Sequence, residues 1–209
     1  MRVLFRVDAS RSIGYGHLYR CLALANALRK SGEACVFACQ SLSGDGVLQI
    51  ENDGFSVVKL SSMLQSGHDD FVFGDRLSWP LGVLEEDCVA VAKILQERQF
   101  DWLVIDHYGI DVEWQRMVPQ GVKIMVLEDT PFRKHNCHIL LDQSHGRPRQ
   151  TYAGLVSDKT KCLMGTQYAL IRGEFFESRA HRSNLIAPNK ISRLFVNFGA
   201  ADQFQVTPR

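Results

Sequence analysis

The sequence predicts an α/β protein whose parallel sheet is covered by helices on both faces. Short apolar runs such as 3–7, 34–39 and 102–105 alternate with longer segments in which apolar residues recur at helical spacing. These runs are continuously apolar, which is typical of strands buried on both faces of a parallel sheet. Several of them end at a polar side chain, as strands do where such a sheet binds a ligand at its carboxyl edge. Together these observations favour a Rossmann-like fold.

The composition argues against some classes of function. The chain has 209 residues, of which 45% are hydrophobic and 22% charged, enough to form a sizeable core. Its net charge of +1 provides no strong field for nucleic acid or a membrane surface. The first apolar run is too short for a signal peptide and no run approaches the ~20 residues of a membrane span, so we expect a cytoplasmic protein. The six cysteines include no Cys-x-x-Cys pair and are expected to be reduced thiols.

The loop after the first strand places a histidine near the start of a helix. Gly14 and Gly16 allow a sharp turn and a close approach of the backbone to a ligand. His17 then falls at or near the helix N-terminus, at the rim of the sheet. An imidazole titrates close to neutral pH and can act there as a general base. The alternative is a histidine that only caps the helix or packs.

Two familiar glycine-rich loops are not matched by this stretch. A dinucleotide-binding loop requires a third glycine where the chain has Tyr19, and an acidic residue after the second strand, where Gln40 stands. A P-loop requires Gly-Lys-Ser/Thr before the helix, whereas the chain has Gly16-His17-Leu18. The sequence therefore argues against NAD binding and against a nucleoside triphosphatase, and no cofactor is expected.

The remaining elements follow from periodicity and from turn residues. Further helices are expected where apolar residues recur three and four positions apart: 18–30, 47–50, 80–95 and 112–118. Further strands are expected in the apolar runs 34–39, 55–60, 102–105, 122–127 and 138–141. Beyond 146–149 the pattern loosens into short extended pieces at 163–164 and 168–171 and a helical turn or two at 174–179. The polar segment 61–79, which carries aromatic residues, is expected to be a surface loop, either a variable insertion or a lid.

Acidic or imidazole side chains follow four of the predicted strands. They are Asp8, Asp106 with His107, Glu128 with Asp129, and Asp142. One such residue would mean little, because turns favour aspartate. Four of them favour a functional site, since the carboxyl ends of parallel strands converge on one crevice.

Four blocks of the sequence resemble one family of enzymes. They are residues 8–25, 104–111, 140–143 and 165–172, and together they run through most of the chain. These blocks resemble the PseG-type UDP-sugar hydrolases of pseudaminic acid biosynthesis, which serves flagellin and surface glycans. The resemblance implies that the sheet is the N-terminal half of a two-domain GT-B fold.

The resemblance also implies a reaction. The substrate UDP-2,4-diacetamido-2,4,6-trideoxy-β-L-altropyranose would be hydrolysed by attack of water at the anomeric carbon, with release of UDP and without a metal or cofactor. An inverting displacement needs a base on the face opposite the leaving group. We predict that His17 is this base. Asp8, the nearest acid in sequence, is expected to fix the tautomer of His17 or to hold a sugar hydroxyl.

Further residues are predicted to bind the substrate. They are Arg11, Gly14, Tyr15, Gly16, Asp106, His107, Tyr108, Gln143 and Tyr168. Arg11 is expected to meet phosphate or to order its loop, whereas Arg20 is expected to form a structural ion pair.

The last part of the chain is predicted to leave this domain. We expect a domain at 1–182 that carries the base, a linker at 183–190, and at 191–209 the first strand and loop of a nucleotide-binding domain. In that loop Ala200 stands where the family has a second glycine and Gln203 where it has a proline, and the rest of the domain does not follow. We therefore expect either a fragment or a naturally truncated protein.

Three other interpretations stay open. A glycosyltransferase of the same fold would transfer the sugar to an acceptor. A metal hydrolase could use His17, Asp106, His107 and Asp129, although no pair has a diagnostic spacing. The third is an inactive remnant that lacks the UDP site. The stereochemistry of the sugar and the oligomeric state are also open.

Overall fold

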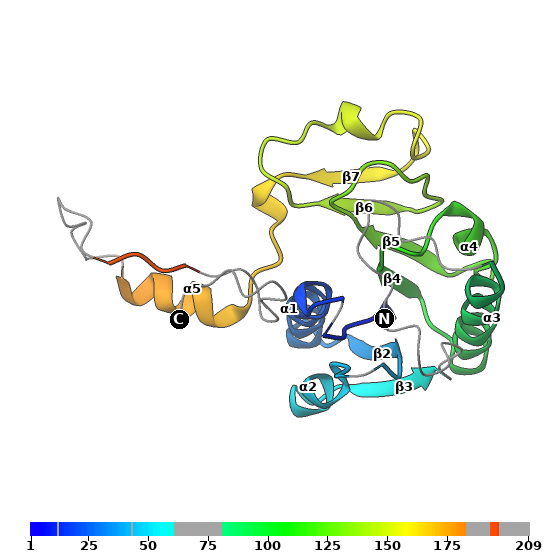
Figure 1. The fold of residues 1–209 in the computed structure, drawn as a ribbon, viewed down its shortest axis with the longest axis horizontal. Helices are drawn as coiled ribbons and strands as arrows, with labels where there is room; N and C mark the ends of the chain where they lie inside the picture. Colours follow the sequence, from blue (N-terminus) through cyan, green and yellow to red (C-terminus); the bar gives the residue numbers. More distant parts are fainter. Residues whose placement is uncertain (12, 43, 61–80, 183–192, 197–209) are drawn as a thin grey trace.

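A seven-stranded parallel sheet forms the centre of the described part of the chain, in the order β3-β2-β1-β4-β5-β6-β7 (Figure 1). This computed structural model describes residues 1–11, 13–42, 44–60, 81–182 and 193–196. The strands are β1 Arg2–Val7, β2 Ala34–Gln40, β3 Ser56–Leu60, β4 Trp102–Asp106, β5 Lys123–Leu127, β6 Ile139–Asp142 and β7 Lys161–Met164. Every neighbouring pair of strands runs parallel. The predicted α/β fold with a Rossmann-like sheet is therefore confirmed.

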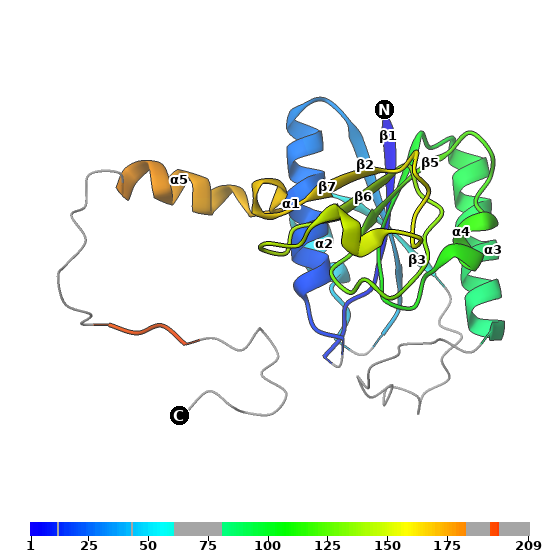
Figure 2. The same cartoon turned by 90° about the horizontal axis from the view of Figure 1, so that it is seen from above.

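Helices cover both faces of this sheet (Figures 1 and 2). They are α1 Gly16–Lys30, α2 Val47–Asn52, α3 Leu81–Arg98, α4 Val112–Arg116 and α5 Gly173–Arg182, with two short 3-10 helices, η1 Arg149–Tyr152 and η2 Thr166–Tyr168. The buried side chains of α1 and α2 join one apolar cluster, and those of α3 and α4 join another on the opposite face. In both views α5 extends away from the sheet.

The first strand shows why the apolar runs are continuous. Val3, Phe5 and Val7 pack in the cluster beneath α1, whereas Leu4 packs in the cluster beneath α3. Successive side chains of a strand point to opposite faces, and here each face is covered by helices. Both sets of positions must therefore be apolar, apart from the buried Arg6 discussed below.

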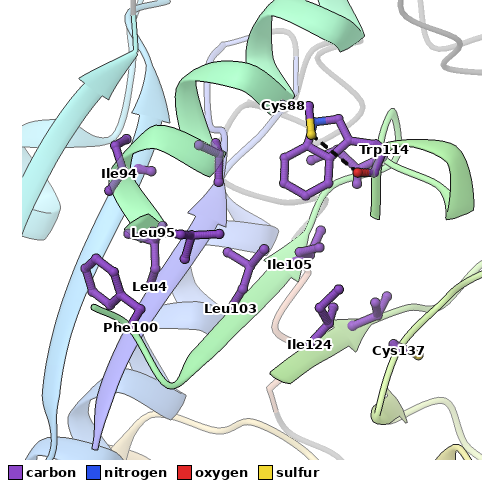
Figure 3. Packing of buried hydrophobic residues seen from close by; sticks show 14 of the residues in the cluster. Leu4, Cys88, Ile94, Leu95, Phe100, Leu103, Ile105, Trp114, Ile124 and Cys137 are labelled. Carbon is purple, nitrogen blue, oxygen red and sulfur yellow. Dashed lines mark hydrogen bonds between the residues drawn. The ribbon is translucent and has the colours of Figure 1, made fainter. Parts of the chain in front are cut away.

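The core beneath α3 joins that helix to α4 and to the central strands. Figure 3 shows Leu95 of α3 beside Leu4 and Leu103 of the sheet, with Trp114 of α4 near Cys88. The Cys88 thiol donates a hydrogen bond to the carbonyl oxygen of Trp114 at 3.4 Å. Each fully buried side chain of this kind stabilises the fold by about 1.5–3 kcal/mol relative to exposure.

The order of the strands creates a switch point between β1 and β4. From β1 the chain proceeds outward through β2 to β3, and it then crosses to β4 on the other side of β1. The connections that leave β1 and β4 therefore diverge to opposite sides of the sheet, an arrangement that in open α/β sheets is associated with a ligand site above the carboxyl ends of the two strands. This is the place where open α/β sheets bind their ligands.

The later elements differ in part from the expectations. The extended piece predicted at 168–171 is corrected at Tyr168, because Gly165 has φ +92 and the chain turns there into η2, where the amide of Tyr168 donates to the carbonyl of Gly165 at 3.1 Å. Ala169 directly after η2 has extended backbone, with φ −61 and ψ 126. The predicted helical turn at 174–179 is confirmed as part of α5. The segment 61–79 and the linker 183–190 lie outside the described residues. Of the strand expected at 191–198, only 193–196 are described, without regular secondary structure, so the domain division stays a prediction.

Candidate active site

The loop after β1 folds back on itself and leads into α1. The carbonyl of Ser10 accepts a hydrogen bond from the amide of Gly14 at 2.8 Å, and the Ser10 hydroxyl accepts one from the amide of Ile13 at 3.0 Å. Gly14 closes the turn with φ +83, a conformation that favours glycine. The helix then begins at Gly16, which places His17 in its first turn at the carboxyl edge of the sheet.

His17 is oriented by an aspartate at the end of β4. Its Nδ1 lies 2.5 Å from Oδ1 of Asp106. Burial raises the pKa of Asp106, but the contact with His17 and the hydrogen bonds from Arg20 outweigh burial and hold this pKa below its usual value. An ionised carboxylate can only accept, so the proton of a neutral His17 lies on Nδ1. This leaves the lone pair on Nε2, to which no described residue is hydrogen-bonded.

Arg20 and Tyr108 complete the surroundings of His17. Arg20 binds Asp106 through Nε and through Nη2, the latter at 2.6 Å, and it binds Oδ2 of Asp129 through Nη1 at 2.8 Å. The hydroxyl of Tyr108 donates to Oδ1 of Asp129 at 2.7 Å, and its ring meets the ring of His17 edge-on at 4.5 Å. The ion pair expected for Arg20 is therefore present, and it is shared by two carboxylates.

Asp8 serves a different network on the other side of β1. Its two oxygens accept hydrogen bonds from Arg6 at 2.6 and 2.8 Å, and Oδ1 also accepts one from the amide of Gln40 at 2.8 Å. Arg6 is fully buried and also binds Asp87 of α3. The expectation that Asp8 orients His17 is corrected, since Asp106 makes that contact. Arg6 lies two positions before Asp8, so the two side chains point to the same face of the sheet. This face lies toward α3, away from α1 and His17.

His107 belongs to the Asp8 network. Its Nε2 lies 3.2 Å from Oδ2 of Asp8, and its Nδ1 accepts a hydrogen bond from the amide of Gly109 at 3.0 Å. Burial lowers the pKa of His107, although the nearby carboxylate of Asp8 opposes this effect. Both ring nitrogens have partners in the protein, so His107 is held within the Asp8 network.

A second buried cluster supports the loop that carries Tyr108. Arg133 donates to the carbonyls of His107 at 3.0 Å and Ile110 at 3.2 Å, and also to that of Tyr108. Its other nitrogen binds Glu128 at 2.5 Å. Burial raises the pKa of Glu128, but the hydrogen bond with His135 and the charge of Arg133 lower it to about 2. Arg133 was not predicted from the sequence, because a single basic residue in a loop does not by itself indicate a buried ion pair.

The other predicted substrate residues are spread along the same edge. Gln143 follows β6, and its Oε1 accepts the amide of Leu170 at 2.9 Å. Tyr168 lies in η2 after β7 and is 39% exposed. Arg11 is exposed in the first loop, and the hydroxyl of Tyr15 in the same loop donates to the carbonyl of Gly44 at 2.7 Å. The structure thus groups Asp106 and Tyr108 with His17, and it places Gln143 and Tyr168 beyond β5.

Within the described ranges, no group of three or more His, Cys, Asp or Glu side chains is arranged to hold a metal ion. No helix in the same part of the chain is long and apolar enough to cross a membrane.

Comparison with known proteins adds a sequence relationship. No family model matches the chain. A hydrolase of Campylobacter jejuni, described as UDP-2,4-diacetamido-2,4,6-trideoxy-beta-L-altropyranose hydrolase, is 34% identical over 179 residues, which are 85% of this chain and 54% of that protein. The chain is a homologue of the PseG-type hydrolases. The blocks that resembled this family in the sequence therefore reflect a relationship over most of the chain.

Other relatives of this PseG homologue are more distant. An uncharacterised protein of Methanocaldococcus jannaschii, MJ1062, is 22% identical over 210 residues, covering 99% of this chain and 38% of that protein. The chain thus spans about half or less of the length of both curated relatives. Among solved structures, MurG of Acinetobacter baumannii matches 70% of this chain and 42% of its own, at 11% identity and a TM-score of 0.46. The glycosyltransferase VinC matches 61% and 34%, at 19% identity and a TM-score of 0.41. The fold assignment rests on the sheet topology and not on these scores.

Proposed function

We propose that this chain supplies the general base of a UDP-sugar hydrolase that acts on UDP-2,4-diacetamido-2,4,6-trideoxy-β-L-altropyranose in pseudaminic acid biosynthesis. The relationship to the C. jejuni hydrolase supports the substrate class. The observation that carries the proposal is the 2.5 Å contact between His17 Nδ1 and Asp106, which directs Nε2 away from the protein partners of the ring. A base at this edge of the sheet lies where ligands of such sheets bind.

In the proposed reaction a water molecule attacks the anomeric carbon of the sugar. Nε2 of His17 accepts a proton from this water as the new C–O bond forms, and the bond between the anomeric carbon and the diphosphate oxygen breaks. The products are the free sugar and UDP, and water is the only other reactant. Asp106 keeps the imidazole in the correct tautomer and stabilises it while it carries the second proton.

The substrate contacts proposed from the sequence divide into two groups. Arg11 and Tyr168 are exposed, and we assign them to the phosphate and to the sugar, respectively. Tyr108 and Gln143 already bind the protein, and we assign their remaining polar atoms to the sugar. The backbone of 14–16 lines the approach to His17. Asp106 acts on the reaction through His17, and His107 acts through Asp8.

The test is UDP release from this substrate by the chain and by His17→Asn. Loss of a general base lowers the rate about 10²- to 10⁴-fold, and we expect substrate affinity measured by calorimetry to change little. His138→Asn is the matched control, because His138 precedes β6 at the opposite edge of the sheet. Full UDP release by His17→Asn would refute the role of His17 as the general base. Absence of UDP release by the unchanged chain would refute the proposed activity.

A further inference from the structure

Asp129 is more exposed than the other charged side chains beside His17. Its side chain is 30% exposed, whereas that of Arg20 is 11% exposed and that of Asp106 is fully buried. Oδ1 of Asp129 accepts a hydrogen bond from the Tyr108 hydroxyl at 2.7 Å, and Oδ2 accepts one from Nη1 of Arg20 at 2.8 Å. These two donors hold the carboxylate in place. A carboxylate can accept about four hydrogen bonds, so Asp129 keeps capacity for a ligand.

The carboxylate of Asp129 selects the kind of ligand group that can lie beside it. An ionised carboxylate only accepts hydrogen bonds, and it repels phosphate oxygens at close range. Arg20 does not provide a free site for phosphate here, because Asp106 and Asp129 already engage its Nε, Nη1 and Nη2. The position next to Asp129 therefore suits an N–H or O–H donor and not the diphosphate.

Gln143 offers the complementary group beside the next strand. Leu127 of β5 and Leu141 of β6 are paired, and both pack beneath α1. Asp129 and Gln143 each follow one of these leucines by two positions, at the carboxyl edge of the sheet. Oε1 of Gln143 accepts the amide of Leu170, which packs against the same cluster, so this side chain also lies on the α1 side. Its Nε2 has no partner among the described residues and can donate.

An acceptor and a donor beside neighbouring strands match an acetamido group. Such a group has one N–H and one carbonyl oxygen, which are carried by separate atoms. A hydroxyl carries its donor and its acceptor on a single oxygen, whereas neighbouring strands lie about 5 Å apart. The acetamido group therefore fits Asp129 and Gln143 better than a sugar hydroxyl does. The proposed substrate has two such groups, on carbons 2 and 4 of the sugar.

The place of these side chains in the sheet favours the acetamido group on carbon 4. Carbon 2 is bonded to the anomeric carbon, which in the proposed reaction lies at His17, whereas carbon 4 lies across the sugar ring. His17 is held at the end of β4 by Asp106, and Gln143 follows β6, two strands or about 10 Å away (Figure 1). The group on carbon 4 fits this separation better than the group on carbon 2.

We propose that Asp129 is a further substrate-binding residue, which together with Gln143 recognises the acetamido group on carbon 4 of the sugar. Asp129 accepts a hydrogen bond from the N–H of this group, and Nε2 of Gln143 donates one to its carbonyl oxygen. The ion pair between Asp129 and Arg20 fixes the direction of the accepting carboxylate. The inference rests on the proposed function for the identity of the substrate and for the place of the anomeric carbon.

The test measures by calorimetry how tightly two variants bind three nucleotide sugars. All proteins are the full chain with His17→Asn, so that the ligands are not consumed. The first ligand is the proposed substrate, the second has hydrogen in place of the acetamido group on carbon 4, and the third has a hydroxyl in place of that on carbon 2. Asp129→Asn places a donor where the proposal requires an acceptor. Gln143→Glu keeps an acceptor for the Leu170 amide but removes the donor.

The proposal requires a loss of affinity that depends on the group on carbon 4. We expect both variants to bind the first and third ligands about 10- to 100-fold more weakly, because each variant loses a hydrogen bond to this group. Both should bind the second ligand as tightly as the protein without either substitution. Gln150→Glu, at an exposed glutamine in η1, is the matched control and should bind all three ligands unchanged.

The second ligand separates recognition from a purely structural role of the ion pair. If Asp129 serves only to hold Arg20 and Tyr108, Asp129→Asn weakens the binding of all three ligands equally, and this result would overturn the proposal. Unchanged affinity for the substrate, or a loss that instead disappears with the group on carbon 2, would overturn it as well. If Asp129→Asn does not fold, Gln143→Glu decides by the same comparison.

The measurements also distinguish this inference from the proposed function, because binding is recorded without turnover. Selective loss of affinity in the variants, together with no UDP release by the unchanged chain, would support the inference and refute the proposed hydrolysis. UDP release by the unchanged chain without a selective loss in the variants would refute the inference alone. If none of the three ligands binds, both are refuted.

Discussion

At the scale of single residues, the site depends on which face of a strand each side chain takes. Val104 packs beneath α1, so Asp106, two positions later, points to the same face and meets His17 of that helix. His107 takes the opposite face and meets Asp8. Two acid and histidine pairs thus form at one edge of the sheet, and only the pair on the α1 side leaves a ring nitrogen without a protein partner among the described residues.

The first prediction concerns the orienting carboxylate. Asp106→Asn replaces an obligatory acceptor with an amide that can also donate, so His17 is no longer held with its proton on Nδ1. We expect kcat for UDP release to fall about 10²- to 10⁴-fold with a small change in KM. Asp158→Asn, an exposed position in the loop before β7, is the control and should keep full activity. Retention of kcat in Asp106→Asn would contradict the dyad.

Much of this site could be predicted from the sequence. The prediction would have been better if each side chain had been assigned to one face of its strand, since successive side chains point to opposite faces. The loop with Gly14 and His17 and the carboxylates at the strand ends were all visible in the sequence. The choice of Asp8 as the partner of His17 relied on closeness in sequence. Arg6, a charge inside an apolar strand, indicates a buried partner on its own face, and Asp8 two positions later is that partner. The partner of His17 must then come from another strand, and Asp106 at the end of the neighbouring β4 is that partner.

At the scale of elements, α1 brings together what the sheet edge presents. His17 and Arg20 lie three positions apart and so share one face of the helix. Their joint contact with Asp106 requires α1 to sit at one fixed height above the sheet. Leu18, Leu22 and Ala25 on the buried face of this helix hold it there. The packing of α1 therefore supports the geometry of the base.

The second prediction concerns the contact between α1 and the start of α2. Gly46 precedes α2 with φ −89, a conformation open to alanine, but a Cβ there would lie 2.1 Å from Cδ2 of Leu18. Leu18 is buried and cannot move freely. We expect Gly46→Ala to lower the free energy of unfolding by roughly 1–3 kcal/mol, measured by urea denaturation.

The control for this substitution lies at the start of α1. A Cβ on Gly16 would meet no atom within 4 Å. Gly16→Ala should therefore leave the free energy of unfolding unchanged or raise it slightly, since alanine favours the helix. Equal losses in both variants would show that the α1 and α2 contact is not as tight as the structure has it.

At the scale of the whole molecule, the helices and strands were easier to predict than the order of the strands in the sheet. The continuous apolar runs predicted the strands, because both faces of each are covered. The order of strands and the switch point depend on contacts between distant segments, which periodicity does not encode. The 3-10 helix η2 was missed because its three residues, Thr166-Gln167-Tyr168, are too few to show a helical periodicity, and the turn at Gly165 decides its course.

Buried ionisable groups make the stability of the whole molecule depend on pH in one direction. The pKa of Glu128 is lowered from 4.5 to about 2, so its contribution is complete above pH 4.5 and is lost as the pH falls through about 2. The pKa of His107 is lowered from 6.5 because burial disfavours its charged form. The fold therefore also loses stability as the pH falls below 6.5, where the unfolded chain takes up this proton first. Acid weakens the fold through both groups.

The last prediction tests the effect of Glu128 with Glu128→Gln. A shift of this size corresponds to roughly 3 kcal/mol, so we expect the variant to be less stable than the unchanged chain by up to this amount near neutral pH. The difference should shrink as the pH falls, because protonation removes the same charge from Glu128. Urea denaturation between about pH 7 and about pH 3 measures it. Glu113→Gln, at an exposed pair with Arg116, should have almost no effect at any pH. A difference for Glu128→Gln that stays constant with pH would indicate that Glu128 contributes through packing and not through its charge.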